Sequence, residues 1–139
     1  MNRIDRLTSI LLMLQSHRVL TAEKISDRFE ISVRTVYRDL SALGEAGVPI
    51  IAEAGVNHNG DIGTAKRLVD AAVEARSDAV KFQTFSVDLL VAPHAPKAEY
   101  QLATTGGEES QAEMIRKLEL PGAAFRALST YCEERGIIF

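Results

Sequence analysis

Four side chains that can hydrogen-bond to a polyanion fall close together in the run SVRTVYRDL: Arg34, Thr35, Tyr37 and Arg38. A guanidinium can donate two hydrogen bonds to guanine in the major groove of DNA, and hydroxyl groups reach phosphate oxygens. If 33–43 is a helix, an advance of about 100° per residue puts both arginines opposite its aliphatic stripe. The pattern therefore predicts a helix that contacts double-stranded DNA, although the same arginines would also suit a face that meets only water.

A second group of polar side chains lies on two apolar runs later in the chain. In DAVKFQTF, the alternation of a strand puts Lys81, Gln83 and Phe85 on one face and Val80, Phe82 and Thr84 on the other. A lysine on an otherwise buried strand is costly unless an anion pairs with it. Glu53, at the end of the run PIIAE, or a bound phosphate would serve. In an open sheet, by contrast, Lys81 and Gln83 would simply face water.

Three short helices are expected to position the first group. Helical periodicity predicts them over 3–15, 22–29 and 33–43, with Thr21 and Ser32 as N-caps of the second and third. The Ser32 hydroxyl would add a further group at the DNA-facing end of the third helix. The apolar stripes comprise Ile4, Leu7, Leu11 and Leu14; Ile25 and Phe29; and Val33, Val36, Leu40 and Leu43. His17 falls in a connection, where a capping or solvated role is expected.

This first segment resembles the N-terminal helix-turn-helix of DeoR-type regulators, including those with a WYL effector domain. The resemblance covers 1–50 and rests on RIDRLTSILLMLQ, TAEKISDRFE and above all SVRTVYRDL. It implies that 33–43 is the recognition helix, with the four side chains named above as DNA contacts. Such regulators continue into a two-stranded wing. Here PIIAEAG could start one, but the residues after it recur at helical spacing, so we expect the wing to be incomplete.

From Pro49 onward, strands and helices alternate. We expect a strand over 49–54, a helix from an Asp61 cap to about Arg76, and a second strand over 78–85. After a long connection from 86 to 110, helices are expected over 111–118 and 122–135, the second capped by Gly136, before IIF begins a third strand. This order is typical of parallel βαβ units with helices on one face.

The second segment resembles the N-acetylneuraminate (sialic acid) synthase family in IIAEAGVNHNGD, TAKRLVDAAVEA, DAVKFQTF, APKAEYQ and YCEERGIIF. Such enzymes condense phosphoenolpyruvate with an N-acetylated amino sugar, using a divalent metal in a (β/α)8 barrel. The resemblance implies that Glu53 contacts the sugar, that Lys81 holds the phosphoenolpyruvate anion and that Gln83 lines the same pocket. Asn57 and His58 are weaker substrate-binding candidates. In EARSD, Arg76 replaces the glycine that commonly caps the helix in this family.

Composition and charge suit a cytoplasmic globular protein. Hydrophobic residues make up 46% of the chain and charged residues 25%, and no apolar run reaches the roughly 20 residues that span a bilayer. The net charge of −3 divides unevenly: 1–50 hold seven basic and six acidic residues, whereas 51–139 hold nine and thirteen. Only the first part suits a polyanion. The single cysteine, Cys132, is expected to be a small core residue.

We therefore expect an α/β chimera with two domains. The first, 1–50, is a helix-turn-helix of winged type, and the second, 51–139, is a partial barrel of two to three βα units. A (β/α)8 barrel takes about 200 residues or more, so we expect no cofactor for this chain and no metal site, since His58 and His94 lack metal-ligand spacing. DNA binding is the leading function, with self-association through exposed sheet surface. The alternatives are an incomplete synthase and a chimera in which neither half functions.

Overall fold

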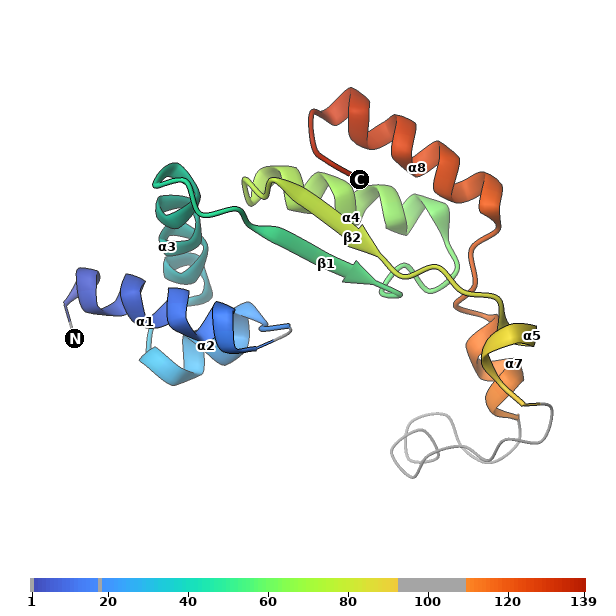
Figure 1. Cartoon of the computed structure of the whole chain (residues 1–139), viewed down its shortest axis with the longest axis horizontal. Coiled ribbons are helices and arrows are strands. Elements are labelled where there is room, and N and C mark those ends of the chain that lie inside the picture. The colour runs from blue at the N-terminus through green and yellow to red at the C-terminus, as the bar shows by residue number, and fades with distance from the viewer. Residues whose placement is uncertain (1, 18, 93–109) are drawn as a thin grey trace.

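The computed structural model describes residues 2–17, 19–92 and 110–139. A helical head precedes a βα part, and the chain passes between them through a short link before the first strand (Figure 1). The head consists of α1 (Arg3–Ser16), α2 (Ala22–Phe29) and α3 (Val33–Glu45). The βα part comprises β1 (Ile51–Gly55), α4 (Ile62–Glu74), β2 (Ala79–Phe82), α5 (Val87–Leu90), α7 (Gln111–Arg116) and α8 (Gly122–Arg135).

The head forms as the helical periodicity predicts, and its helices begin at side-chain caps. Thr21 accepts from the Lys24 amide and Ser32 from the Thr35 amide, so each satisfies a backbone donor that the helix leaves open. The His17 ring bonds to the Met13 carbonyl and caps the end of α1. The head core contains Ile10, Ile25, Val36 and Leu43, with Leu7, Leu11, Leu14, Phe29 and Leu40 packed around it.

One residue of the apolar stripe in α1 lies outside the core. Ile4 is 76% exposed, whereas Ile10 is fully buried at the centre of the head. Ile4 lies in the first turn of α1 and is not part of the head core, although Arg3 and Arg6 of the same turn contact Asp39 of α3. Helical spacing shows which side of a helix is apolar, but it does not show which residues on that side the other helices cover.

The first strand belongs to the βα part rather than to a wing. β1 pairs in parallel with β2, so that Ile51, Ala52 and Glu53 align with Ala79, Val80 and Lys81. A wing would need an antiparallel hairpin, and the parallel register requires instead the crossover that α4 provides. Ile138 forms a parallel bridge to Ala79 on the other side of β2, as expected for the start of a third strand.

Helices α4 and α8 lie on the same side of the sheet and pack against each other (Figure 1). Their small and aliphatic side chains form the second core with Ala54 and Val80 from the strands. Cys132 of α8 is fully buried there, and burial raises the pKa of its thiol. α4 starts at its Asp61 cap and α8 ends at Gly136, which has a left-handed backbone. The expected helix boundaries at these caps are confirmed.

Several other boundaries differ from expectation. β2 ends at Phe82, three residues earlier than predicted, although the Gln83 amide still donates to Gly55. The short helix α5 occupies the start of the expected long connection, and α7 ends at Arg116. The alternation of side chains along one strand does not show where its partner strand stops. Because β2 pairs with β1, it ends where that pairing ends. Residues 93–109 of the connection, including His94, lie outside the described residues.

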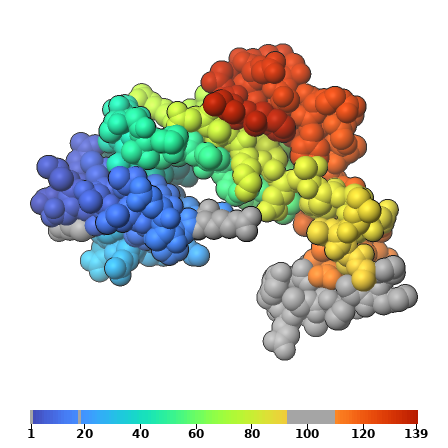
Figure 2. Space-filling view, viewed as in Figure 1, coloured from blue at the N-terminus to red at the C-terminus, as the bar shows by residue number. Residues whose placement is uncertain are grey.

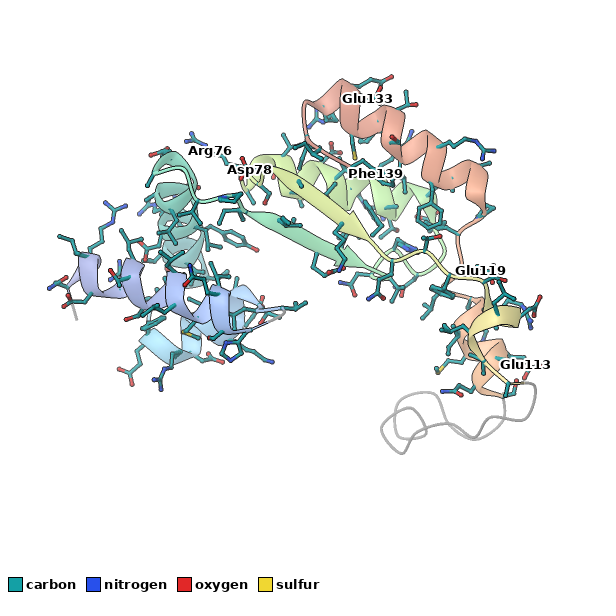
Figure 3. All side chains as sticks on the ribbon, viewed as in Figure 1. Arg76, Asp78, Glu113, Glu119, Glu133 and Phe139 are labelled. Atoms are coloured by element: carbon teal, nitrogen blue, oxygen red, sulfur yellow. The ribbon has the colours of Figure 1, made fainter. Side chains whose placement is uncertain are left out.

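The link between the two parts is held at several points. The Ile50 amide donates to the Asp78 carboxylate at 2.7 Å, and the Asp78 amide donates back to the Ile50 carbonyl at 2.8 Å. Arg76, near Asp78 in Figure 3, forms an ion pair with Glu45 of α3 at 2.8 Å. These contacts connect the end of α3 to the start of the sheet.

Candidate nucleic-acid interface and a second polar site

The outer side of α3 presents the two predicted arginines to solvent. Arg34 and Arg38 are exposed, whereas Val36 and Leu43 on the opposite side are buried in the head core. Among the residues that the structure describes, neither guanidinium is paired with a carboxylate. Both arginines are therefore available to an anionic partner such as DNA.

The hydroxyl groups at the start of α3 serve the helix itself. Ser32 caps α3 through the Thr35 amide at 3.2 Å, and the two side-chain oxygens lie 2.9 Å apart. Either hydroxyl can be the donor of that bond. Ser32 is exposed and Thr35 is half-buried, so Ser32 is the more accessible of the two.

Tyr37 occupies a different flank of α3. Its side chain is 46% exposed and, with Leu40, borders a cleft of about 810 Å³ between the head and the βα part. Leu11, Leu14 and Leu20 line the head side of the cleft; Ala52, Leu68 and Ala71 line the opposite side. Figure 2 shows the two parts as separate masses that meet near the end of α3. Tyr37 therefore lies between the outer face of α3 and the cleft.

An ion pair under α3 was missed by the sequence interpretation. Asp39 is 1% exposed, and Arg6 of α1 binds it through Nε at 2.6 Å and Nη2 at 3.3 Å. The signal was present in the spacing, because Asp39 lies three residues after Val36 and four before Leu43, on the buried side of the helix. An acidic residue at such a position implies a cationic partner inside the head.

The polar residues of the second site come from adjacent strands. Glu53 and Lys81 are register partners on β1 and β2, and the Lys81 ammonium donates to Glu53 Oε2. The expected carboxylate partner of Lys81 is therefore confirmed. The Lys81 side chain is 51% exposed and that of Glu53 is 23% exposed, and Glu53 Oε1 is buried without a hydrogen-bond partner among the described residues. Gln83 lies beyond the end of β2 and is exposed.

Asn57 and His58 lie in the tight turn after β1 but in opposite environments. Asn57 is exposed, whereas His58 is buried and its ring lies 6.1 Å from that of Phe82. His58 Nδ1 accepts a hydrogen bond from the Gly60 amide at 3.1 Å, which leaves the proton of the neutral ring on Nε2. Burial lowers the pKa of His58 because the charged imidazolium is poorly solvated there.

The described residues do not fit a divalent-metal site. Within 2–17, 19–92 and 110–139, no three His, Cys, Asp or Glu side chains come together as metal ligands. The divalent metal that the synthase resemblance implies would need ligands from outside this part of the chain.

None of the helices within 2–17, 19–92 and 110–139 has the length and the apolar composition needed to span a membrane.

Comparisons with known proteins match the two parts of the chain to different families, and the helix-turn-helix match extends past β1. Residues 68–139 match the NeuB family and residues 6–60 match a helix-turn-helix domain. The chain belongs to the NeuB family, and it is a chimera in which a helix-turn-helix head precedes a sialic acid synthase region.

Individual relatives show the same division. N,N'-diacetyllegionaminic acid synthase of Campylobacter jejuni is 47% identical over 65% of this chain and 27% of its own length. The uncharacterised regulator YobV of Bacillus subtilis is 36% identical over 38% of this chain and 17% of its own length. A crystal structure of N-acetylneuraminic acid synthetase from Leptospira borgpetersenii aligns with a TM-score of 0.48 and 28% identity, covering 66% of this chain and 28% of that one. The chain thus spans about a quarter of the length of the curated synthase it matches.

Proposed function

We propose that the chain binds double-stranded DNA in a sequence-specific manner through α3, with the NeuB-family part as a spacer or association surface. The observation that carries this proposal is the exposure of Arg34 and Arg38 on a helix anchored by its opposite side. A helix held in this way can enter the major groove with its arginines directed at base edges. The helix-turn-helix match and the relation to an HTH-type regulator support the same function.

Charge supports DNA binding by the head more than by the βα part. The head carries a net charge of about +1 against −4 for the remainder, so its arginines would have to overcome repulsion between the acidic βα part and phosphate. We expect the head to lie against the duplex with the βα part directed away. Binding should weaken as salt rises, because each phosphate contact releases counterions.

The test uses a duplex that the full chain selects from a randomised pool, compared with a scrambled duplex of the same composition. Arg34→Ala and Arg38→Ala should each weaken binding to the selected duplex by about 1 to 3 kcal/mol. Arg126→Ala, which removes an exposed arginine from α8, is the matched control. Fluorescence anisotropy in which the unmodified chain shows no preference for the selected duplex would contradict sequence-specific binding.

We also infer that two copies associate through the sheet. Ile51 of β1 is 64% exposed, and α4 and α8 cover only one side of the two strands. An exposed strand edge with an apolar side chain favours self-association, and a dimer would present two recognition helices to two half-sites. Ile51→Lys should then lower the mass measured by light scattering at high protein concentration. A monomer for both forms would contradict the inference.

A second candidate function follows from the Glu53–Lys81 pair. The carboxylate and ammonium lie on adjacent parallel strands, where a barrel of this kind places its site, and the chain belongs to the NeuB family. In this function Lys81 holds the phosphoenolpyruvate anion, Glu53 contacts an N-acetylated amino sugar, and Gln83 lines the same pocket. Asn57 is a weaker candidate for substrate binding, and His58 would have to become exposed to take part, because it is buried. The remaining strands and the divalent metal would come from a second polypeptide.

Calorimetry with phosphoenolpyruvate tests this second candidate. The unmodified chain should bind the ligand, whereas Lys81→Met should not, because the anion loses its cation. Synthase activity should appear only when the chain is mixed with the remaining portion of a NeuB-family barrel. Absence of both phosphoenolpyruvate binding and complementation would exclude the synthase function. If the DNA-binding test failed as well, neither half of the chain would have its proposed role.

A further inference from the structure

A buried ion pair joins α1 to α3 beneath the outer face of α3. Arg6 binds both carboxylate oxygens of Asp39, and Arg3 Nε approaches Asp39 Oδ1 at 3.6 Å. The Arg6 side chain is 14% exposed and that of Asp39 is 2% exposed, whereas that of Arg3 is 62% exposed. Arg6 is therefore committed to Asp39, and Arg3 adds a weaker contact at the rim.

The Arg6–Asp39 pair is not readily explained by a gain in the stability of the fold. Removing two charges from water is costly, and buried ion pairs can often be replaced by apolar side chains without loss of stability. What a two-point guanidinium contact does provide is a fixed direction, because both hydrogen bonds form only in one relative orientation. The hydrophobic contacts of the head core are not directional in this way.

Asp39 follows Arg38 directly and lies on the opposite side of α3 from Arg34. Each residue advances about 100° around a helix, so rotation of α3 would move the two arginines away from the bases they face. The two hydrogen bonds between Arg6 and Asp39 limit the rotation of α3 relative to α1. The hydrogen bond to Asp39 also raises the pKa of Arg6, so the Arg6 guanidinium stays charged.

We propose that Asp39 is a positioning residue that fixes the rotation of α3 through Arg6, and so determines how Arg34 and Arg38 meet DNA. The proposal rests on the proposed function of α3 in DNA binding. It assigns sequence discrimination in part to two residues that contact no DNA. In this proposal Arg6 does not contact DNA phosphate, because its guanidinium is bound to Asp39 within the head.

The test compares the full chain with Asp39→Asn, and with the double variant Arg6→Met, Asp39→Leu, which replaces the pair by apolar side chains. Asp27→Asn, an exposed acidic residue of α2, matches the charge change. Each protein is titrated with the selected and the scrambled duplex at a temperature where circular dichroism shows it folded. The ratio of the two dissociation constants should fall about tenfold in Asp39→Asn and in the double variant, and stay unchanged in Asp27→Asn.

The double variant makes the test independent of stability. If it melts as the unmodified chain does but loses discrimination, positioning is supported; if it keeps the full ratio, positioning is overturned. Should Asp39→Asn fail to fold, the double variant and Arg6→Lys, which keeps the charge but not the two-point contact, decide in the same way. Failure of the proposed function itself is distinguishable, because the unmodified chain would then show no preference to lose.

Discussion

Lys81 and Glu53, 28 residues apart in the chain, are direct neighbours across two parallel strands, and the lysine ammonium donates to the glutamate carboxylate. The pair lies on the side of the strands opposite the core formed with α4 and α8. Because the Lys81 side chain is half exposed, water screens much of the attraction. We therefore expect the pair to contribute little to the stability of the fold.

Replacing this pair should have a small effect on stability. In a double-mutant cycle with Glu53→Gln and Lys81→Met, we expect a coupling free energy of about 0.2 to 1 kcal/mol. Urea denaturation of the two single variants and the double variant measures it. A coupling well above this range would show that the pair is shielded from water and holds the strands together.

Gly60 should tolerate no side chain. Its φ is +74°, and a Cβ there would overlap the carbonyl oxygen of Lys117. Gly60→Ala should therefore destabilise the protein by about 2 to 4 kcal/mol, from the left-handed backbone and the overlap together. Gly44→Ala is the matched control: nothing lies near its Cβ and it is within α3, so a stabilisation of up to about 1 kcal/mol is expected. Equal thermal melting of the two variants would contradict this account.

Arg76 adopts the left-handed backbone in which helices usually end on glycine. Its φ is 57°, and the Ser77 amide bonds back to the Ala72 carbonyl, as at a glycine-capped helix end. We expect Arg76→Gly to be more stable than Arg76→Ala by about 1 kcal/mol, because only glycine adopts this conformation without strain. Both variants lose the ion pair with Glu45, so the comparison isolates the backbone. Chemical denaturation that ranks alanine above glycine would refute it.

Acid should destabilise the βα part through His58. Its pKa in the folded protein is below the ordinary 6.5, so as pH falls through 6.5 the unfolded chain takes up a proton that the folded protein does not. This contribution to stability is complete above the unfolded pKa and declines below it, by at most about 1.4 kcal/mol per pH unit. Protonation of Nδ1 would also break its bond from the Gly60 amide.

Comparison with His58→Gln isolates this effect, since the other titrating groups are the same in both proteins. Between about pH 7.5 and about pH 5.5, the unmodified chain should lose more free energy of unfolding than the variant. Urea denaturation at each pH measures the difference. An equal loss in the two proteins would mean that His58 is accessible to protons in the folded state.

Much of the local structure was predictable because its causes lie within a few residues. The caps at Thr21, Ser32 and Asp61 and the terminal glycine at Gly136 act on adjacent turns, and the structure confirms all four. The outward direction of Arg34 also follows from periodicity alone. The length of β2 was predicted wrongly and the exposure of Ile4 did not follow from its stripe, because both depend on contacts with other elements.

The sequence by itself determined the two kinds of structure in this chain and the identity of the residues that could contact DNA or an anion, since helix caps, periodicity and motifs are local. The parallel order of β1 and β2 was expected from the alternation of strand and helix, and only the tertiary structure decided the register that places Glu53 beside Lys81. It also decided that Arg6 reaches Asp39 beneath α3 and that His58 is buried while Asn57 is exposed. These outcomes depend on contacts between residues that are distant in the chain. The packing of the folded protein, and not the neighbours in sequence, determines which of these side chains lose water and which way they point.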